Sequence, residues 1–293
     1  MEIIFVLDGS DDSYEAARGL SGLAHADEVT VLTVASVPGL AYPTIGAGIA
    51  KDLSMQVEVA LREEGAKLLE RVVSLLPPNP GPVKKVLQLG DPAEIIIGMA
   101  EARQANLIVL GARGLGTIKE HMFGSVSHRV MTHASCSTLI VKESLRTIQR
   151  ILIPLAHQDD GEAMVKFFET QPFREPVHVT VMHVVPFAQP VWPVGAMIPG
   201  SFQQEIIAHG EQFTEEVAAK LRNLGHEAKG IAVMGAPSTS IADKVKEYDY
   251  PVCFNFPTGH IDENYTLTLG MIHKLNITEL GTHMELVNDH LIT

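Results

Sequence analysis

The chain carries one pattern of segments twice, and this internal repeat constrains its fold more than any other feature. Three short segments of the first half recur in the same order in the second half, each about 150 positions later, which indicates a tandem duplication. They are the apolar runs 3–7 and 151–155, the apolar runs 29–34 and 179–184, and the triplets 90–92 and 235–237. The sequence therefore predicts two domains of one fold, residues 1–145 and 146–293, each of ordinary domain size.

Within each copy, short apolar runs alternate with amphipathic segments. A continuous apolar run such as 3–7 is typical of a strand that is covered on both faces. Ser10 followed by two acids is typical of a helix N-terminus, and so is Asp91 before Pro92. The second copy follows the plan of the first, whose expected strands are 3–7, 29–34, 83–89, 106–110 and 138–141. This alternation predicts a doubly wound, parallel α/β sheet in each domain, which is a Rossmann-like architecture.

The balance of charges and the apolar pattern exclude several partners. Lys and Arg total 22 against 35 Asp and Glu, so the net charge of −13 repels phosphate backbones and we expect no nucleic-acid partner. An anionic ligand must instead be held by local dipoles. The sequence shows no apolar run of membrane-spanning length, no signal peptide at its start, and only two cysteines, Cys136 and Cys253. These features favour a cytoplasmic protein without a membrane partner.

A glycine-rich segment leaves the fourth expected strand and enters the next helix. Gly111 and Gly114 remove side chains where the backbone must approach a ligand or adopt a positive φ angle. Gly124 and Ser125 open the helix, where free N–H groups, the helix dipole and a hydroxyl suit a phosphate group. The segment lacks the Gly-Lys-Ser/Thr of a Walker loop, and it follows too late a strand for the dinucleotide fingerprint. Glycines after a strand are also common turn residues, which is the alternative interpretation.

The spacing Gly-x2-Gly-x9-Gly-Ser resembles the motif of the ATP-binding members of the universal stress protein family. The opening residues 6–10, Val-Leu-Asp-Gly-Ser, also resemble the family's first-strand signature, although many members have proline where this chain has Val6. The resemblance covers both halves in architecture and is specific in the first half alone. It implies an adenine nucleotide alpha hydrolase-like fold that binds an adenine nucleotide (ATP, ADP or AMP), with Mg²⁺ as a companion of the phosphates.

The resemblance also implies which residues bind the nucleotide. Asp8 would lie in the adenosine pocket, and Val34 at the end of the second strand would contact the nucleoside. The phosphates would lie against Gly111, Gly114, Gly124, Ser125 and Val126. Arg113 lies between the two loop glycines, where its guanidinium either reaches a phosphate or stays in solvent. Without the resemblance, Asp8 is better explained as a helix N-cap or a turn residue.

The second copy lacks this motif. Ala156 stands at the position of the strand-end aspartate, Phe256 at that of the first loop glycine, and Met271 at that of the motif serine. The loop between them adds acids at 262–263, which would repel phosphate. We therefore expect the second domain to bind no nucleotide in the family manner.

The second half also holds nine of the 13 histidines, but their spacing is not that of a metal site, and we expect no metal ligands. His183 lies on an expected strand, where we expect a core residue with its hydrogen bonds satisfied. Cys136 and Cys253 are interpreted as buried thiols.

Two classes of function remain open at this point. The first is a nucleotide-binding regulatory protein of the stress response, with at most slow ATP hydrolysis. Glu120 and His121 are candidates for positioning a water molecule, and are equally well explained as exposed loop residues. The second class is a nucleotide-independent interaction scaffold, in which the glycines serve folding alone. In a weaker third interpretation the second domain binds a different small ligand, lined by Trp192, Phe254 and Phe256.

The expected strand 138–141 would end the first sheet, and an exposed edge strand invites pairing. The resemblance implies that such edges pair between domains, both inside one chain and between two chains of a homodimer. The degenerate second domain would then act as a regulatory partner of the first.

Overall fold

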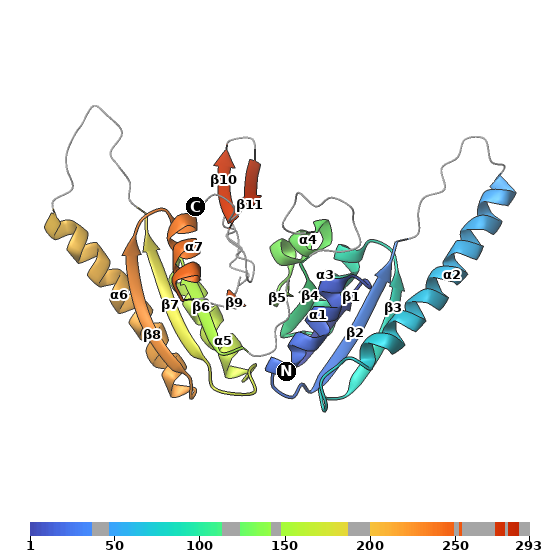
Figure 1. Cartoon of the computed structure of the whole chain (residues 1–293), viewed down its shortest axis with the longest axis horizontal. Helices are drawn as coiled ribbons and strands as arrows, with labels where there is room; N and C mark the ends of the chain where they lie inside the picture. The colour runs from blue at the N-terminus through green and yellow to red at the C-terminus, as the bar shows by residue number, and fades with distance from the viewer. Residues whose placement is uncertain are drawn as a thin grey trace, which may run out of the picture. The chain divides into compact units, whose positions relative to one another are not determined.

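The computed structural model describes residues 1–36, 47–112, 124–141, 148–186, 200–248, 252–253, 273–278 and 281–286. The chain divides into two compact units, Met1–Arg146 and Thr147–Thr293, and each contains a parallel sheet (Figure 1). Among the helices of the described ranges, none is both long and apolar enough to cross a membrane.

The first unit is a five-stranded sheet whose strands alternate with helices. Its strands are β1 (Glu2–Leu7), β2 (Glu28–Ala35), β3 (Val83–Leu89), β4 (Leu107–Gly111) and β5 (Ser137–Val141). Its helices are α1 (Asp11–Gly19), a 3-10 turn (Leu20–Gly22), α2 (Ala47–Val73), α3 (Pro92–Ala102) and α4 (Ser125–His133). All paired strands run parallel in the order β3-β2-β1-β4-β5, which confirms the predicted doubly wound fold and places β5 at an edge.

Polar caps begin two helices where the sequence predicts them. The Ser10 hydroxyl accepts a hydrogen bond from the Ser13 N–H at 3.3 Å. The Asp91 carboxylate accepts one from the Glu94 N–H at 3.0 Å, directly before Pro92. Each cap satisfies a first-turn N–H that has no partner inside its helix. Both α1 and α3 therefore begin at the edge where the strands end.

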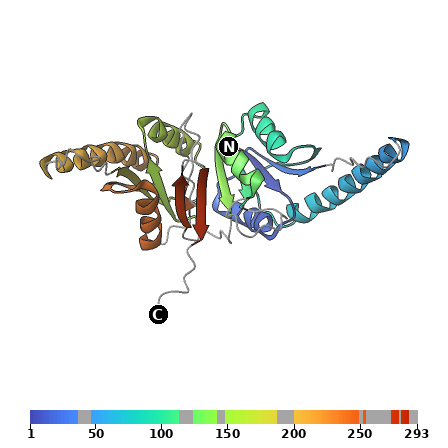
Figure 2. The ribbon, with the colours of Figure 1, turned by 90° about the horizontal axis from the view of Figure 1, so that it is seen from above.

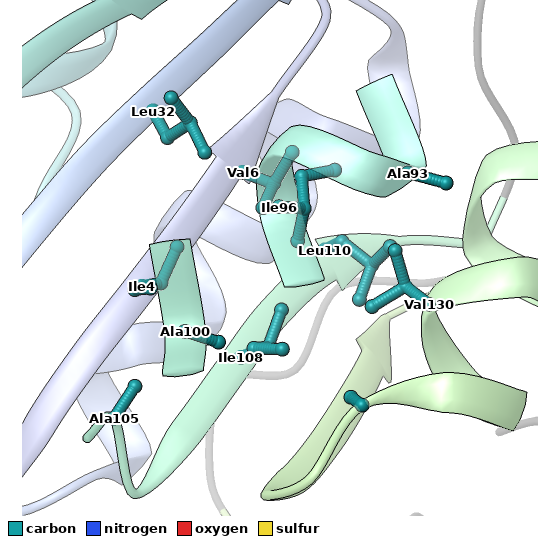
Figure 3. Packing of buried hydrophobic residues seen from close by; sticks show 11 residues of the cluster. Ile4, Val6, Leu32, Ala93, Ile96, Ala100, Ala105, Ile108, Leu110 and Val130 are labelled. Carbon is teal, nitrogen blue, oxygen red and sulfur yellow. The ribbon is translucent and has the colours of Figure 1, made fainter. Parts of the chain in front are cut away.

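Helices cover both faces of the first sheet (Figure 2). Thr33 of β2 lies on the α2 face, because a Cβ built at Gly65 of α2 would stand 3.6 Å from its methyl group. The neighbouring Leu32 belongs to the opposite face, where α3 and α4 cover a buried apolar cluster (Figure 3). The cluster comprises Ile4, Val6, Leu32, Ala93, Ile96, Ala100, Ala105, Ile108, Leu110, Val130 and Ala134. Close packing on both faces holds the ends of β1 and β4 at fixed positions.

The second unit repeats this architecture, as the duplication predicts. Its parallel sheet has the order β8-β7-β6-β9, which matches β3-β2-β1-β4 of the first unit. Its elements are β6 (Arg150–Leu155), α5 (Gln158–Glu169), β7 (His178–Val185), α6 (Gly200–Asn223), β8 (Glu227–Met234), α7 (Pro237–Tyr248) and β9 (Val252–Cys253).

The second unit differs from the repeat plan in its last strands. β10 (His273–Thr278) and β11 (Gly281–Leu286) pair antiparallel in a separate two-stranded sheet. Because only residues 279–280 connect them, a parallel crossover of a dozen or more residues is impossible and a hairpin results.

Candidate functional site

Three strands of the first unit end side by side and bring the predicted site residues to one edge. Leu7 of β1 pairs with Thr33 of β2, so Asp8 directly after β1 lies next to Val34. On its other side β1 pairs with β4, which ends at Gly111. The strand order reverses between β1 and β4, and such a switch point is where open α/β sheets bind ligands.

The Asp8 carboxylate is held by the turn that follows β1. Its Oδ1 accepts hydrogen bonds from the Ser10 N–H at 3.0 Å and from the Ser10 hydroxyl at 2.6 Å. Gly9 between them adopts φ +83°, a conformation that favours glycine. Ser10, rather than Asp8, is the N-cap of α1. Asp8 is therefore a half-buried turn residue whose carboxylate has a defined direction at the end of the sheet.

Gly111 lacks a side chain because helix α1 approaches it closely. A Cβ at this position would lie 2.9 Å from the carbonyl carbon of Asp12 and 2.9 Å from the nitrogen of Ser13. The backbone of Gly111 does not adopt a positive φ, unlike Gly9. Packing against α1 is by itself a sufficient reason for glycine here.

The N-terminus of α4 stands beside the end of β4. Gly124 is its N-cap, with φ −66°, and supplies no side chain to bond the first-turn N–H groups. Ser125 is exposed at the first helical position, and Val126 packs against the apolar cluster. N–H groups of the first turn have no partner within a helix and carry the positive end of its dipole. Such a terminus suits a phosphate or another anion.

Sequence reasoning missed one residue of this region, Ser127. Its hydroxyl donates to the Gly111 carbonyl oxygen at 2.8 Å, and the residue is 4% exposed. The available signal was its place three residues after Gly124, on the face that α4 turns to the sheet. Arg113 and Gly114 of the motif, like Glu120 and His121, lie outside the described residues.

An exposed ion pair connects α3 with α4 near this edge. The Arg129 guanidinium contacts the two Asp91 carboxylate oxygens at 3.1 and 2.9 Å. The pKa of Asp91 is lowered, first by the hydrogen bond from the N–H of Glu94 and then by the hydrogen bond from Arg129.

In the same unit, burial raises the pKa of the Cys136 thiol to about 11, so this half-buried cysteine is a poor nucleophile.

The corresponding edge of the second unit has a different chemistry. The N–H groups of Ala156 and His157 both donate to the Asp160 carboxylate of α5, at 2.8 and 2.9 Å. Nδ1 of His183 lies 2.9 Å from the Leu155 carbonyl oxygen, and its ring meets Phe213 edge to face, so the histidine has the partner that was predicted but is half-buried rather than a core residue. Phe256 and Met271, which replace motif residues, lie outside the described residues, as do Trp192 and Phe254.

The sheet order and its helices define a Rossmann-like α/β protein whose strand order reverses at this edge. The model of the universal stress protein family matches residues 1–142. A universal stress protein of Thermus aquaticus is 31% identical over 140 residues, covering 48% of this chain and 97% of the relative. Universal stress protein YxiE of Bacillus subtilis is 28% identical over 151 residues, covering 48% and 98%. This chain belongs to the universal stress protein family.

The likeness to solved structures extends over both units. The crystal structure of a universal stress protein from Archaeoglobus fulgidus covers 86% of this chain and 85% of its own, with a TM-score of 0.55. At 18% identity this likeness supports the fold of the tandem chain and nothing finer.

Proposed function

We propose that the first unit binds an adenine nucleotide (ATP, ADP or AMP) and that the chain acts as a nucleotide-dependent regulator in the stress response. The observation that carries the proposal is the meeting of Asp8, Val34 and the N-terminus of α4 at the switch point of the sheet. The glycine motif of the family supports it at Gly124 and Ser125, the beginning of that helix.

Each part of this edge matches one part of the ligand. The Asp8 carboxylate is an acceptor for ribose or adenine donors, and Val34 offers an apolar surface to the nucleoside. Gly124, Ser125 and Val126 present the first-turn N–H groups of α4 to the phosphates, with Gly111 beside them. Arg113 and Gly114 complete the motif and remain predictions from the sequence.

Mg²⁺ fits this site only as a companion of the phosphates. Within the described ranges, His, Cys, Asp and Glu side chains form no group of three or more that is placed to hold a metal. Mg²⁺ is commonly bound through substrate phosphates with few protein carboxylates. The ion would therefore enter with the nucleotide.

We further propose that the second unit binds no nucleotide in the family manner and serves as a regulatory partner of the first. Ala156 offers a methyl group where the first unit has the Asp8 carboxylate. Pairing of the two domains, assembly into a homodimer and a cytoplasmic location belong to the same proposal. Deletion of residues 147–293 tests the regulatory role, because unchanged nucleotide affinity would speak against it.

The direct test is the identity and stoichiometry of nucleotide released by acid from the purified full chain, measured by chromatography and mass spectrometry. We expect one nucleotide per chain. Two per chain would show that the second unit also binds.

The second experiment titrates nucleotide-free protein with ATP by calorimetry. Asp8→Ala and Gly114→Val should abolish binding, whereas Asp11→Ala removes an exposed carboxylate from the start of α1 and should leave it intact.

The competing function is a nucleotide-independent interaction scaffold. One observation favours it, since packing against α1 already explains why residue 111 is glycine. Failure of the full chain both to release nucleotide and to bind added ATP would select this alternative.

A further inference from the structure

Two hydrogen bonds join the end of β4 to the beginning of α4, on either side of the 113–123 segment. The Gly124 N–H donates to the Ala112 carbonyl oxygen at 2.9 Å. The Ser127 hydroxyl donates to the Gly111 carbonyl oxygen at 2.8 Å, and its 4% exposure shields this bond from water. The helix thus begins at a point fixed on the edge of the sheet.

The second bond adds an orienting contact at the first turn of α4. Packing on the apolar cluster and the ion pair of Arg129 with Asp91 hold the body of the helix. The bonds at Gly124 and Ser127 fix its first turn against the end of β4. The N–H groups of the first turn point along the helix axis, out of the N-terminus. Ser127 therefore helps to set where these donors are aimed relative to the end of β4.

We propose that Ser127 is a positioning residue for the phosphates of the nucleotide, an inference that rests on the proposed function. Its hydroxyl donates to Gly111 and so acts through the helix rather than on the ligand. Replacing it takes a buried donor from the Gly111 carbonyl and lets the first turn of α4 rotate. Asp8 directly follows β1 and Val34 lies on β2, so recognition of the nucleoside does not depend on this bond.

The test compares ATP with adenosine, by calorimetry on the full chain. Ser127→Ala should weaken ATP binding about tenfold, the effect of one lost buried hydrogen bond, and should leave adenosine affinity within about twofold. Ser127→Thr keeps the donor and should restore ATP binding. Thr132→Ala is the matched control on the same helix, because its exposed hydroxyl donates to the His128 carbonyl at 2.9 Å and does not contact β4.

The outcomes separate this inference from the proposed function. If the wild-type chain binds ATP and Ser127→Ala binds it equally well, Ser127 has no positioning role and the proposed function stands. An equal loss of ATP and adenosine affinity would show a general structural role and would also overturn the inference. Wild-type protein that binds neither ligand overturns both. If Ser127→Ala does not fold, Ser127→Cys supplies a weak donor of similar size and should show an intermediate loss that is selective for ATP.

Discussion

At the scale of single residues, the turn after β1 serves the fold and the proposed site together. Ser10 caps α1 through its hydroxyl oxygen and donates the hydroxyl proton to Asp8. A carboxylate held in this way is already oriented before a ligand arrives, which lowers the entropy cost of binding. Gly111 also has two roles. Its lack of a side chain leaves room for the backbone of α1, and it ends β4 beside the proposed phosphate site.

Gly111→Ala should lower the free energy of unfolding by about 1–3 kcal/mol, because its Cβ would lie too close to the α1 backbone and a helix must shift. The measurement is urea unfolding followed by circular dichroism. Gly98→Ala is the control, since a Cβ in this exposed part of α3 meets nothing within 4 Å and should stabilise the helix by about 0.5–1 kcal/mol. Equal effects of the two changes would refute the packing argument.

A half-buried histidine should make the second unit sensitive to acid. His226 lies edge to face with Phe168 at 5.0 Å, and its Nδ1 accepts the Val177 N–H at 3.3 Å. Burial lowers the pKa of His226 below its usual value of 6.5. Well above pH 6.5 the ring is neutral in both the folded and the unfolded state, so its protonation costs no folding stability. As the pH falls below about 6.5, the unfolded state takes up the proton first and stability declines, until the folded pKa is passed.

The acid effect is measured as the urea midpoint between about pH 7.5 and pH 5, followed by fluorescence of Trp192, the single tryptophan. His226→Phe should reduce the pH dependence. His178→Gln removes an exposed histidine that pairs with Glu227 at 2.8 Å, and should alter it far less. Unchanged acid dependence in His226→Phe would contradict the assignment.

At the scale of elements, the two copies differ in how corresponding helices begin. Asp91 caps α3 and binds Arg129 of α4, which fastens two helices on one face of the first sheet. In the second unit Ala236 stands in the same place, and the Ser240 N–H donates to its carbonyl oxygen at 2.9 Å. The helix α7 therefore begins at the same point without a side-chain acceptor.

Exchanging the capping residues should shift stability in opposite directions. Asp91→Ala should lower the melting temperature of the first unit, because a first-turn N–H loses its acceptor and Arg129 its partner. Ala236→Asp should stabilise the second unit by about 1 kcal/mol. Calorimetry of the full chain and Trp192 fluorescence measure the two effects. Ala236→Asn should reproduce the gain without charge, and a loss with either variant would show that α7 begins differently.

At the scale of the whole molecule, the two units share the order of four parallel strands but differ in the chemistry at the ends of those strands. The first ends in a turn that holds a carboxylate, next to a helix N-terminus without a side-chain cap. In the second, backbone N–H groups at the end of β6 are taken by Asp160 of the unit's own helix. This difference in local chemistry is the physical basis for the proposal that one unit alone binds a nucleotide.

Saturating ATP should therefore protect one unit alone. At about 100 times the dissociation constant, ligand binding adds about 2.7 kcal/mol to the stability of the state that binds it. Hydrogen exchange followed by mass spectrometry reads the strands separately. Amides of β1 and β4 should gain protection, with little change in β6 and β7. Equal protection in both units would contradict a single site.

The candidate site was predictable from the sequence only in part. Gly111 and Gly124 were predicted from the local glycine spacing, and Asp8 and Val34 from the resemblance to the family; the structure brings Asp8 and Val34 to the edge where β4 ends at Gly111, and ligand binding there stays a prediction. The hydrogen bond of Ser127 to Gly111 was not predictable, because helical spacing can place a serine on the face turned to the sheet but cannot say which carbonyl group it meets. Likewise, the glycine spacing pointed to a ligand or a positive φ at Gly111, whereas the structure shows close contact with α1.

The sequence alone determined the duplication, the alternation of strands and helices, and the caps at Ser10 and Asp91. These features depend on periodicity and on side chains within four residues of the groups they bind. The tertiary structure decided which strand ends become neighbours, that β10 and β11 form a separate hairpin, and that α1 and α4 meet the end of β4. Those contacts join segments far apart in the chain, and packing of the whole sheet, rather than any local pattern, brings them together.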